Sequence, residues 1–106
     1  MNLEISVQEL KAELESGREL FLLDVRESDE LEICQLPGVV HIPLAELPTR
    51  TYEIAPESDV VVICRTGGRS GRATQFLAAN GYDKVRNMVG GMHAWADAFD
   101  PMMPKY

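Results

Sequence analysis

A short segment with one cysteine, two glycines and two arginines carries the strongest chemical signal in the sequence. It runs from Cys64 to Ser70, with the letters CRTGGRS, and follows the β-branched run Val60–Ile63. Adjacent glycines allow a tight curl in which successive backbone N–H groups converge on one point, an arrangement that binds anions. A helix expected after the segment adds unpaired N–H groups and the positive end of its dipole. We therefore predict that Cys64 is held as a thiolate, the nucleophilic form of the side chain.

The charges around this segment differ from those of the rest of the chain. The 106 residues include 17 Asp and Glu against 10 Lys and Arg, which gives a net charge of −7. The 23 residues between Asp59 and Asp83 nevertheless contain no acidic side chain, and they hold Arg65, Arg69 and Arg72. An acidic chain thus has one locally positive segment around one cysteine. The other interpretation, a small buried cysteine with solvated arginines nearby, stays open.

The position of the second arginine bears on which group the segment transfers. Cysteine-dependent phosphatases have an arginine six positions after the cysteine, where it closes a loop around phosphate. Here that position holds Ser70, and Arg69 comes one residue earlier. The shorter loop has less room for a tetrahedral phosphoryl group, but it can enclose one extra sulfur atom on Cys64. The spacing therefore favours sulfur transfer, and a phosphatase or arsenate reductase is the alternative.

Strand and helix patterns alternate along the chain around this segment. Apolar and β-branched runs predict strands over residues 20–25, 39–43, 60–63 and 84–88. Helices are predicted from a capping box at Ser6 to Gly17, over 28–33, in a single turn at 44–47 before Pro48, and over 92–99. A further helix is predicted to follow a turn at 64–70 and to stop at Gly81. This alternation predicts an α/β fold with a small, mostly parallel sheet of about five strands and helices on both faces. No repeat or linker interrupts it, so we expect a single domain over residues 1–106.

Several segments together resemble the rhodanese family of sulfurtransferases, specifically its single-domain members. In the first half, the resemblance lies in LLDVRE at 22–27, LPGV at 36–39 and Ile42-Pro43. In the second half, it lies in VVIC at 61–64, Gly67, Arg69-Ser70, Val89-Gly90-Gly91 and Trp95. The chain departs from the family in having Cys34-Gln35 where rhodaneses often carry Gly-His. That variant resembles rhodanese domains attached to E1-like sulfur-relay enzymes.

The resemblance implies a two-step transfer of sulfur through a persulfide on Cys64. The thiolate would take a sulfane sulfur from a small anionic donor such as thiosulfate. An acceptor, either cyanide, a thiol, or a carrier or E1-like protein, would then remove that sulfur from the cysteine. No metal or organic cofactor is needed for this chemistry. The loop expected to bind the donor and the persulfide consists of Arg65, Thr66, Gly67, Gly68, Arg69 and Ser70.

Five further residues are candidates for parts of the site. Asp24 and Arg26 follow a predicted strand, so they either line the pocket or, as we prefer, order a loop through an ion pair. Cys34 is expected to pack in the core rather than to relay sulfur. His41 and His93 have no Cys or His at metal-ligand spacing, so no metal site is predicted.

Charge, hydropathy and cysteine count indicate which partners and which cellular location to expect. A net negative charge disfavours nucleic acid and anionic membranes as partners. No apolar run approaches the ~18 residues of a membrane span. Two cysteines are too few for a secreted disulfide scaffold, so we expect a reducing, cytoplasmic environment. A regulatory docking module without turnover is the third functional alternative.

Overall fold

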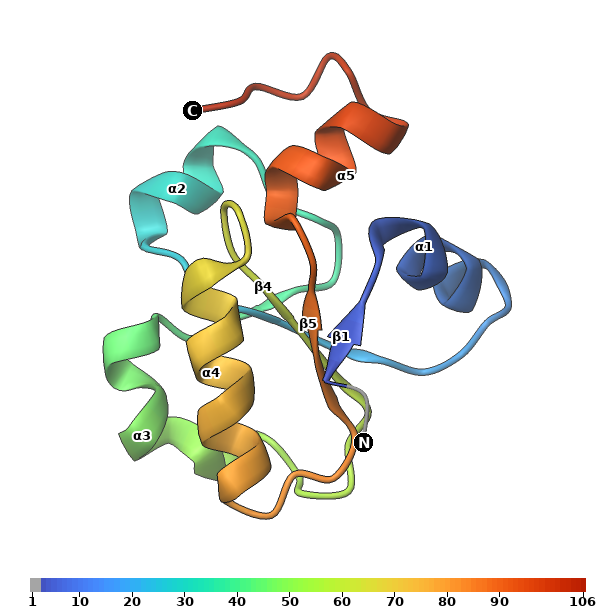
Figure 1. Cartoon of the computed structure of the whole chain (residues 1–106). Helices are drawn as coiled ribbons and strands as arrows, with labels where there is room; N and C mark the ends of the chain where they lie inside the picture. The colour runs from blue at the N-terminus through green and yellow to red at the C-terminus, as the bar shows by residue number, and fades with distance from the viewer. Residues whose placement is uncertain (1–2) are drawn as a thin grey trace.

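In the computed structural model, which describes residues 3–106, the chain forms a five-stranded sheet with the order β1-β5-β4-β2-β3 (Figure 1). All four pairings are parallel, so the strands end at one edge of the sheet. The central strand β4 is completely buried because helices cover it on both sides. The strands are β1 (Glu4–Ile5), β2 (Phe21–Asp24), β3 (Val40–His41), β4 (Val60–Ile63) and β5 (Val85–Met88).

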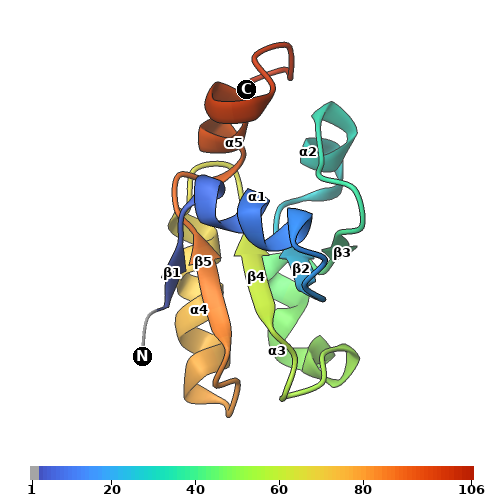
Figure 2. The same cartoon turned by 90° about the vertical axis from the view of Figure 1, so that its right-hand side faces the viewer.

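The helices lie on both faces of the sheet, with α1 in front of it and α4 behind it in Figure 2. Alternate side chains of β4 therefore enter two separate cores. Val60 and Val62 pack with residues of α3 and α4, whereas Val61 and Ile63 pack with residues of α1 and α5. The predicted α/β architecture is confirmed. The helices are α1 (Val7–Glu15), α2 (Ser28–Ile33), α3 (Leu47–Arg50), α4 (Gly68–Ala79) and α5 (Gly91–Phe99), with 3-10 turns η1 (Leu44–Glu46) and η2 (Thr51–Glu53).

Three details differ from the sequence-based expectations. The edge strand β1 was not predicted, because two residues are too few to show a period of two. The helical turn expected to stop before Pro48 instead continues through α3, since a proline in the first turn of a helix replaces an N–H group that has no partner there. Helix α4 begins at Gly68, inside the segment expected to be a turn. None of the helices within residues 3–106 is both long and apolar enough to cross a bilayer.

Candidate active site

Cys64 lies directly after the central strand β4, at the edge where all the strands end. Its side chain is buried, with 1% of the residue exposed. The Sγ atom accepts hydrogen bonds from the Gly67 amide at 3.1 Å, the Ser70 amide at 3.3 Å and the Ser70 hydroxyl at 3.2 Å. Gly67 has a φ of +106°, which turns the chain back toward the sulfur and starts α4. Three donors therefore converge on one buried thiol.

The environment of Cys64 lowers the pKa of its thiol. Burial by itself raises this pKa, because it disfavours the charged form. The hydroxyl and amide of Ser70 lower it, and so do the amides of Gly67 and Thr66, all by hydrogen bonding to the anion. The hydrogen bonds outweigh burial, so the pKa of the thiol lies below its ordinary value. A lower pKa increases the thiolate fraction near neutral pH.

The beginning of α5 explains why the loop turns its N–H groups toward the sulfur. The Met92 amide donates to the Cys64 carbonyl at 2.9 Å, and the His93 amide donates to the Arg65 carbonyl at 3.1 Å. These amides lie in the first turn of α5, where N–H groups have no partner within the helix. Because α5 binds the loop carbonyls from outside, the loop amides are left to face Cys64.

An acidic residue from α2 reaches into the positively charged segment. Glu30 binds the Arg69 guanidinium through two hydrogen bonds of 2.6 and 2.7 Å. This pairing lowers the pKa of Glu30 to about 2, against the effect of burial. It also raises the pKa of Arg69, despite the burial of that group. The locally positive field inferred from the sequence is therefore partly neutralised by a residue 39 positions away.

Tyr106 packs against the rim of the Cys64 loop. Its ring lies beneath the Arg65 guanidinium, with 5.0 Å from the carbon to the ring centroid. Its hydroxyl accepts a hydrogen bond from Arg26 at 2.7 Å and donates one to Glu30 at 3.0 Å. In Figure 1 the C-terminal segment passes above α5 and ends near α2. Tyr106 thus connects the Cys64 loop to Arg26, which follows β2, and to Glu30 of α2.

Asp24 and Arg26 form a fully buried ion pair, with 2.8 Å between Arg26 Nη2 and Asp24 Oδ2. Burial lowers the pKa of Arg26, but hydrogen bonds to Asp24 and Tyr106 raise it above the ordinary value. Arg26 also donates to the carbonyls of Cys34, at 2.7 Å, and of Glu30, at 3.4 Å. The pair therefore connects the end of β2 to α2, which carries the partner of the loop's second arginine.

The other sequence candidates lie outside the loop. Cys34 is half-buried at the end of α2, where it packs against the core shared by α1 and α5. Cys34 and Cys64 are both free thiols. His93 is within 3.5 Å of Arg65 Nε, and His41 is within 2.6 Å of the Arg26 carbonyl oxygen. In the described part of the chain, no three His, Cys, Asp or Glu side chains are grouped so that they could hold a metal ion.

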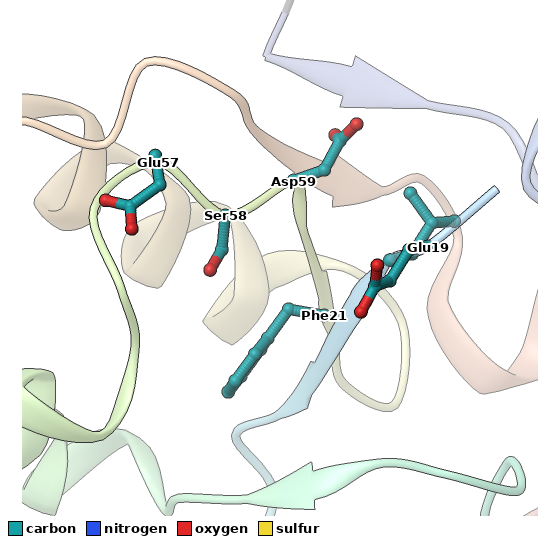
Figure 3. A pocket seen from close by; sticks show the side chains of 6 residues that line it. Glu19, Phe21, Glu57, Ser58 and Asp59 are labelled. Atoms are coloured by element: carbon teal, nitrogen blue, oxygen red, sulfur yellow. The ribbon is translucent and has the colours of Figure 1, made fainter.

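A pocket lies at the opposite edge of the sheet from the Cys64 loop (Figure 3). Glu19, Phe21, Glu57, Ser58 and Asp59 line it, together with Leu20, at the amino ends of β2 and β4. Neither cysteine lines this pocket. Three of its residues are acidic, whereas a site for a small anion needs positive charge. The Cys64 loop is therefore the stronger candidate for an active site.

Several residues of the site were not found from the sequence. Glu30 and Asn87 lie on α2 and β5, and the amides of Met92 and His93 belong to α5. Asn87 donates to the Gly67 carbonyl at 3.2 Å and accepts from the Ser70 hydroxyl at 2.5 Å. For Asn87, the available signal was a polar side chain within the predicted strand at 84–88. For the amides of α5, the available signal was the pair Gly90-Gly91 before the last predicted helix, since adjacent glycines permit close backbone contact.

This buried thiol, ringed by amides at the end of a parallel sheet, occurs in a fold shared with known proteins. The model of the rhodanese-like domain family matches residues 6–98, and the chain belongs to that family. The solved structure of the human single domain sulfurtransferase TSTD1 superposes with a TM-score of 0.80 at 28% identity, covering 92% of this chain and 98% of that one.

Two curated relatives contain a region similar to this chain within a longer protein. YrkF of Bacillus subtilis (strain 168) is 41% identical over 92 residues, which is 87% of this chain and 50% of YrkF. The adenylyltransferase and sulfurtransferase MOCS3 of Arabidopsis thaliana is 36% identical over 118 residues, covering 96% of this chain and 25% of MOCS3. The chain thus spans half or less of the length of these two relatives.

Proposed function

We propose that this domain is a sulfurtransferase in which Cys64 carries the transferred sulfur as a persulfide. The observation that carries the proposal is the set of three hydrogen bonds to the buried Sγ atom. Donors fixed around an anion stabilise it without reorganisation, and removal of one such donor costs roughly a hundredfold or more in rate. The amides of the loop can stabilise both the thiolate and the anionic persulfide that replaces it.

The proposed first step transfers a sulfur atom from thiosulfate. The Cys64 thiolate supplies an electron pair to the outer sulfur, and a new S–S bond forms on the enzyme. The S–S bond of thiosulfate breaks, sulfite leaves with its electron pair, and the negative charge ends on the outer sulfur of the persulfide. No proton is transferred, so this step needs no general base. In the second step, cyanide or a thiolate attacks the outer sulfur, and the Cys64 thiolate is released.

The two arginines of the loop have different proposed roles. Arg65 is exposed at the rim, where its charge can attract an anionic donor. Arg69 is held by Glu30, so we assign it mainly to keeping the first turn of α4 in place. Because Glu30 neutralises the charge of Arg69, the loop has less positive charge for a phosphoryl dianion, which argues against a phosphatase.

The physiological acceptor that we propose is a thiol or a carrier protein. Support comes from the similarity to MOCS3, whose name couples sulfurtransferase and adenylyltransferase activities. The proposed environment is the reducing cytoplasm, where free thiols persist. Asp24 and Arg26 are proposed to order the site by supporting α2 rather than to touch the substrate.

Intact-mass spectrometry after incubation with thiosulfate tests the proposal directly. We expect the wild-type protein to gain one sulfur atom, which a reducing thiol removes. Cys64→Ser should gain none and should form no thiocyanate from thiosulfate and cyanide. Cys34→Ser is the matched control and should behave as wild type. Full activity of Cys64→Ser refutes the proposal, and so does hydrolysis of an aryl phosphate without any sulfur transfer.

A further inference from the structure

The Ser70 hydroxyl has one hydrogen atom and two acceptors within reach. Cys64 Sγ lies at 3.2 Å from Ser70 Oγ, and Asn87 Oδ1 lies at 2.5 Å. Ser70 is fully buried, with 0% of the residue exposed. A hydroxyl donates a single hydrogen bond, so it serves either the sulfur or the amide oxygen at one time. The strength of the third hydrogen bond to Cys64 therefore depends on Asn87.

The orientation of the Asn87 amide is determined by a second contact. Its Nδ2 group donates to the Gly67 carbonyl at 3.2 Å. A reversed amide would place an oxygen against that carbonyl, where two acceptors repel each other, so the oxygen faces Ser70. The backbone of Asn87 is held inside the sheet, because it pairs with Val62 of β4 and Glu4 of β1.

We propose that Asn87 is a positioning residue that competes with Cys64 Sγ for the hydroxyl proton of Ser70. When the Ser70 hydroxyl donates to Asn87 Oδ1, the thiolate retains its two amide donors but is less strongly stabilised. Among thiolates, nucleophilicity decreases as the thiol pKa decreases. Competition by Asn87 therefore keeps the Cys64 thiolate more nucleophilic than a thiolate that accepts all three hydrogen bonds.

The competition also has a consequence for turnover, which rests on the proposed function. When Cys64 carries a persulfide, the negative charge lies on the outer sulfur and Sγ becomes a weak, uncharged acceptor. The Ser70 hydroxyl can then move its hydrogen bond to Asn87 Oδ1 instead of losing a partner in a buried position. Asn87 thus gives the hydroxyl a partner in both states of the cysteine.

The charged and titratable groups around the loop must stay unchanged in a test of this idea. Asn87 is uncharged, and its side chain bonds to Ser70 and Gly67. Substitution of Asn87 or Ser70 by alanine removes no charge from the site. The groups that remain in place are Arg65 in the loop, Arg69 on α4, Glu30 on α2, His93 on α5 and Tyr106.

The test is the pH dependence of Cys64 alkylation by iodoacetamide in wild type, Asn87→Ala, Ser70→Ala and the double variant. Peptide mass spectrometry separates Cys64 from Cys34. We expect Ser70→Ala to raise the midpoint by roughly 0.5–1 pH unit, the worth of one hydrogen bond. Asn87→Ala should lower the midpoint when Ser70 is present, because the hydroxyl is then free to serve the sulfur. In the Ser70→Ala background, Asn87→Ala should not lower it.

A second variant keeps the test decisive if Asn87→Ala does not fold. Asn87→Asp retains the size and the acceptor, and its carboxylate binds the hydroxyl more strongly. It also adds a charge and places an oxygen against the Gly67 carbonyl, but it does so in both Ser70 backgrounds, so the comparison between the backgrounds isolates the effect on the hydroxyl. It should raise the midpoint more when Ser70 is present than in the Ser70→Ala background. Equal shifts in the two backgrounds, for either substitution, overturn the inference. Alkylation requires no sulfur transfer, so a protein without sulfurtransferase activity can still pass this test.

Discussion

Substitution of Gly91 by alanine is expected to disrupt the Cys64 loop from outside. A Cβ atom at this position would lie 2.5 Å from the carbonyl oxygens of both Cys64 and Arg65. Both neighbours are backbone atoms, so the loop or the start of α5 must move. The two hydrogen bonds from α5 to these carbonyls would be lost, at about 1 kcal/mol each. The left-handed φ of +59° adds about 1–2 kcal/mol, for a total of about 3–4 kcal/mol.

Gly38 provides a matched control for this prediction. It also has a positive φ, +79°, but a Cβ added there meets nothing within 4 Å. Gly38→Ala should therefore cost only the backbone strain of about 1–2 kcal/mol. Urea unfolding followed by the fluorescence of Trp95, the single tryptophan, measures both variants. Equal destabilisation by the two substitutions would show that the contact between α5 and the loop is unimportant for stability. We also expect Gly91→Ala to raise the pKa of Cys64, because freed carbonyls allow the amides to turn away.

Three further predictions concern the charged network behind the loop. Asp24→Ala should destabilise the protein by about 3–5 kcal/mol in urea unfolding, because it leaves Arg26 charged and buried without its partner. Glu30→Gln should cost on the order of 1 kcal/mol above the unfolded pKa of about 4.3. This difference from wild type should shrink as pH falls from there through the folded pKa of Glu30, about 2, because the carboxylate becomes protonated in the folded state. A constant difference between pH 7 and pH 2 would contradict the ion pair with Arg69. Tyr106→Phe should cost about 1 kcal/mol, because the hydroxyl bonds both Arg26 and Glu30, and thermal unfolding that matches wild type would contradict this.

Local patterns were sufficient to predict most elements of the fold. The run Val60–Ile63 predicts a strand with both faces covered, and it forms the fully buried centre of the sheet. The capping box of Ser6 and Glu9 marks the start of α1, where both reciprocal hydrogen bonds are present. Strand β1 escaped prediction because it is defined by its pairing with β5 and not by a pattern of its own.

The part of the site that is contiguous in the sequence could be predicted, whereas the partners from distant segments could not. The segment from Cys64 to Ser70 is contiguous, and its glycines and following helix indicate where the amides can gather. The partners that complete it are distant in sequence, since Glu30 is 39 residues from Arg69 and Asn87 is 17 residues from Ser70. A glutamate on an acidic helix is not unusual, so no pattern marks Glu30, whereas the only signal for Asn87 is a polar side chain within a predicted strand.

By itself, the sequence determined which residues could provide a nucleophile and an anion-binding turn, because both depend on residue types within a few positions of each other. The tertiary structure decided which way that turn faces. The carbonyls of Cys64 and Arg65 are bound by amides of α5, and every residue except proline carries such an amide, so side-chain identity does not reveal this contact. It also decided how much positive charge remains at the loop, because the fold brings Glu30 of α2 to Arg69 of α4, 39 positions away in the sequence.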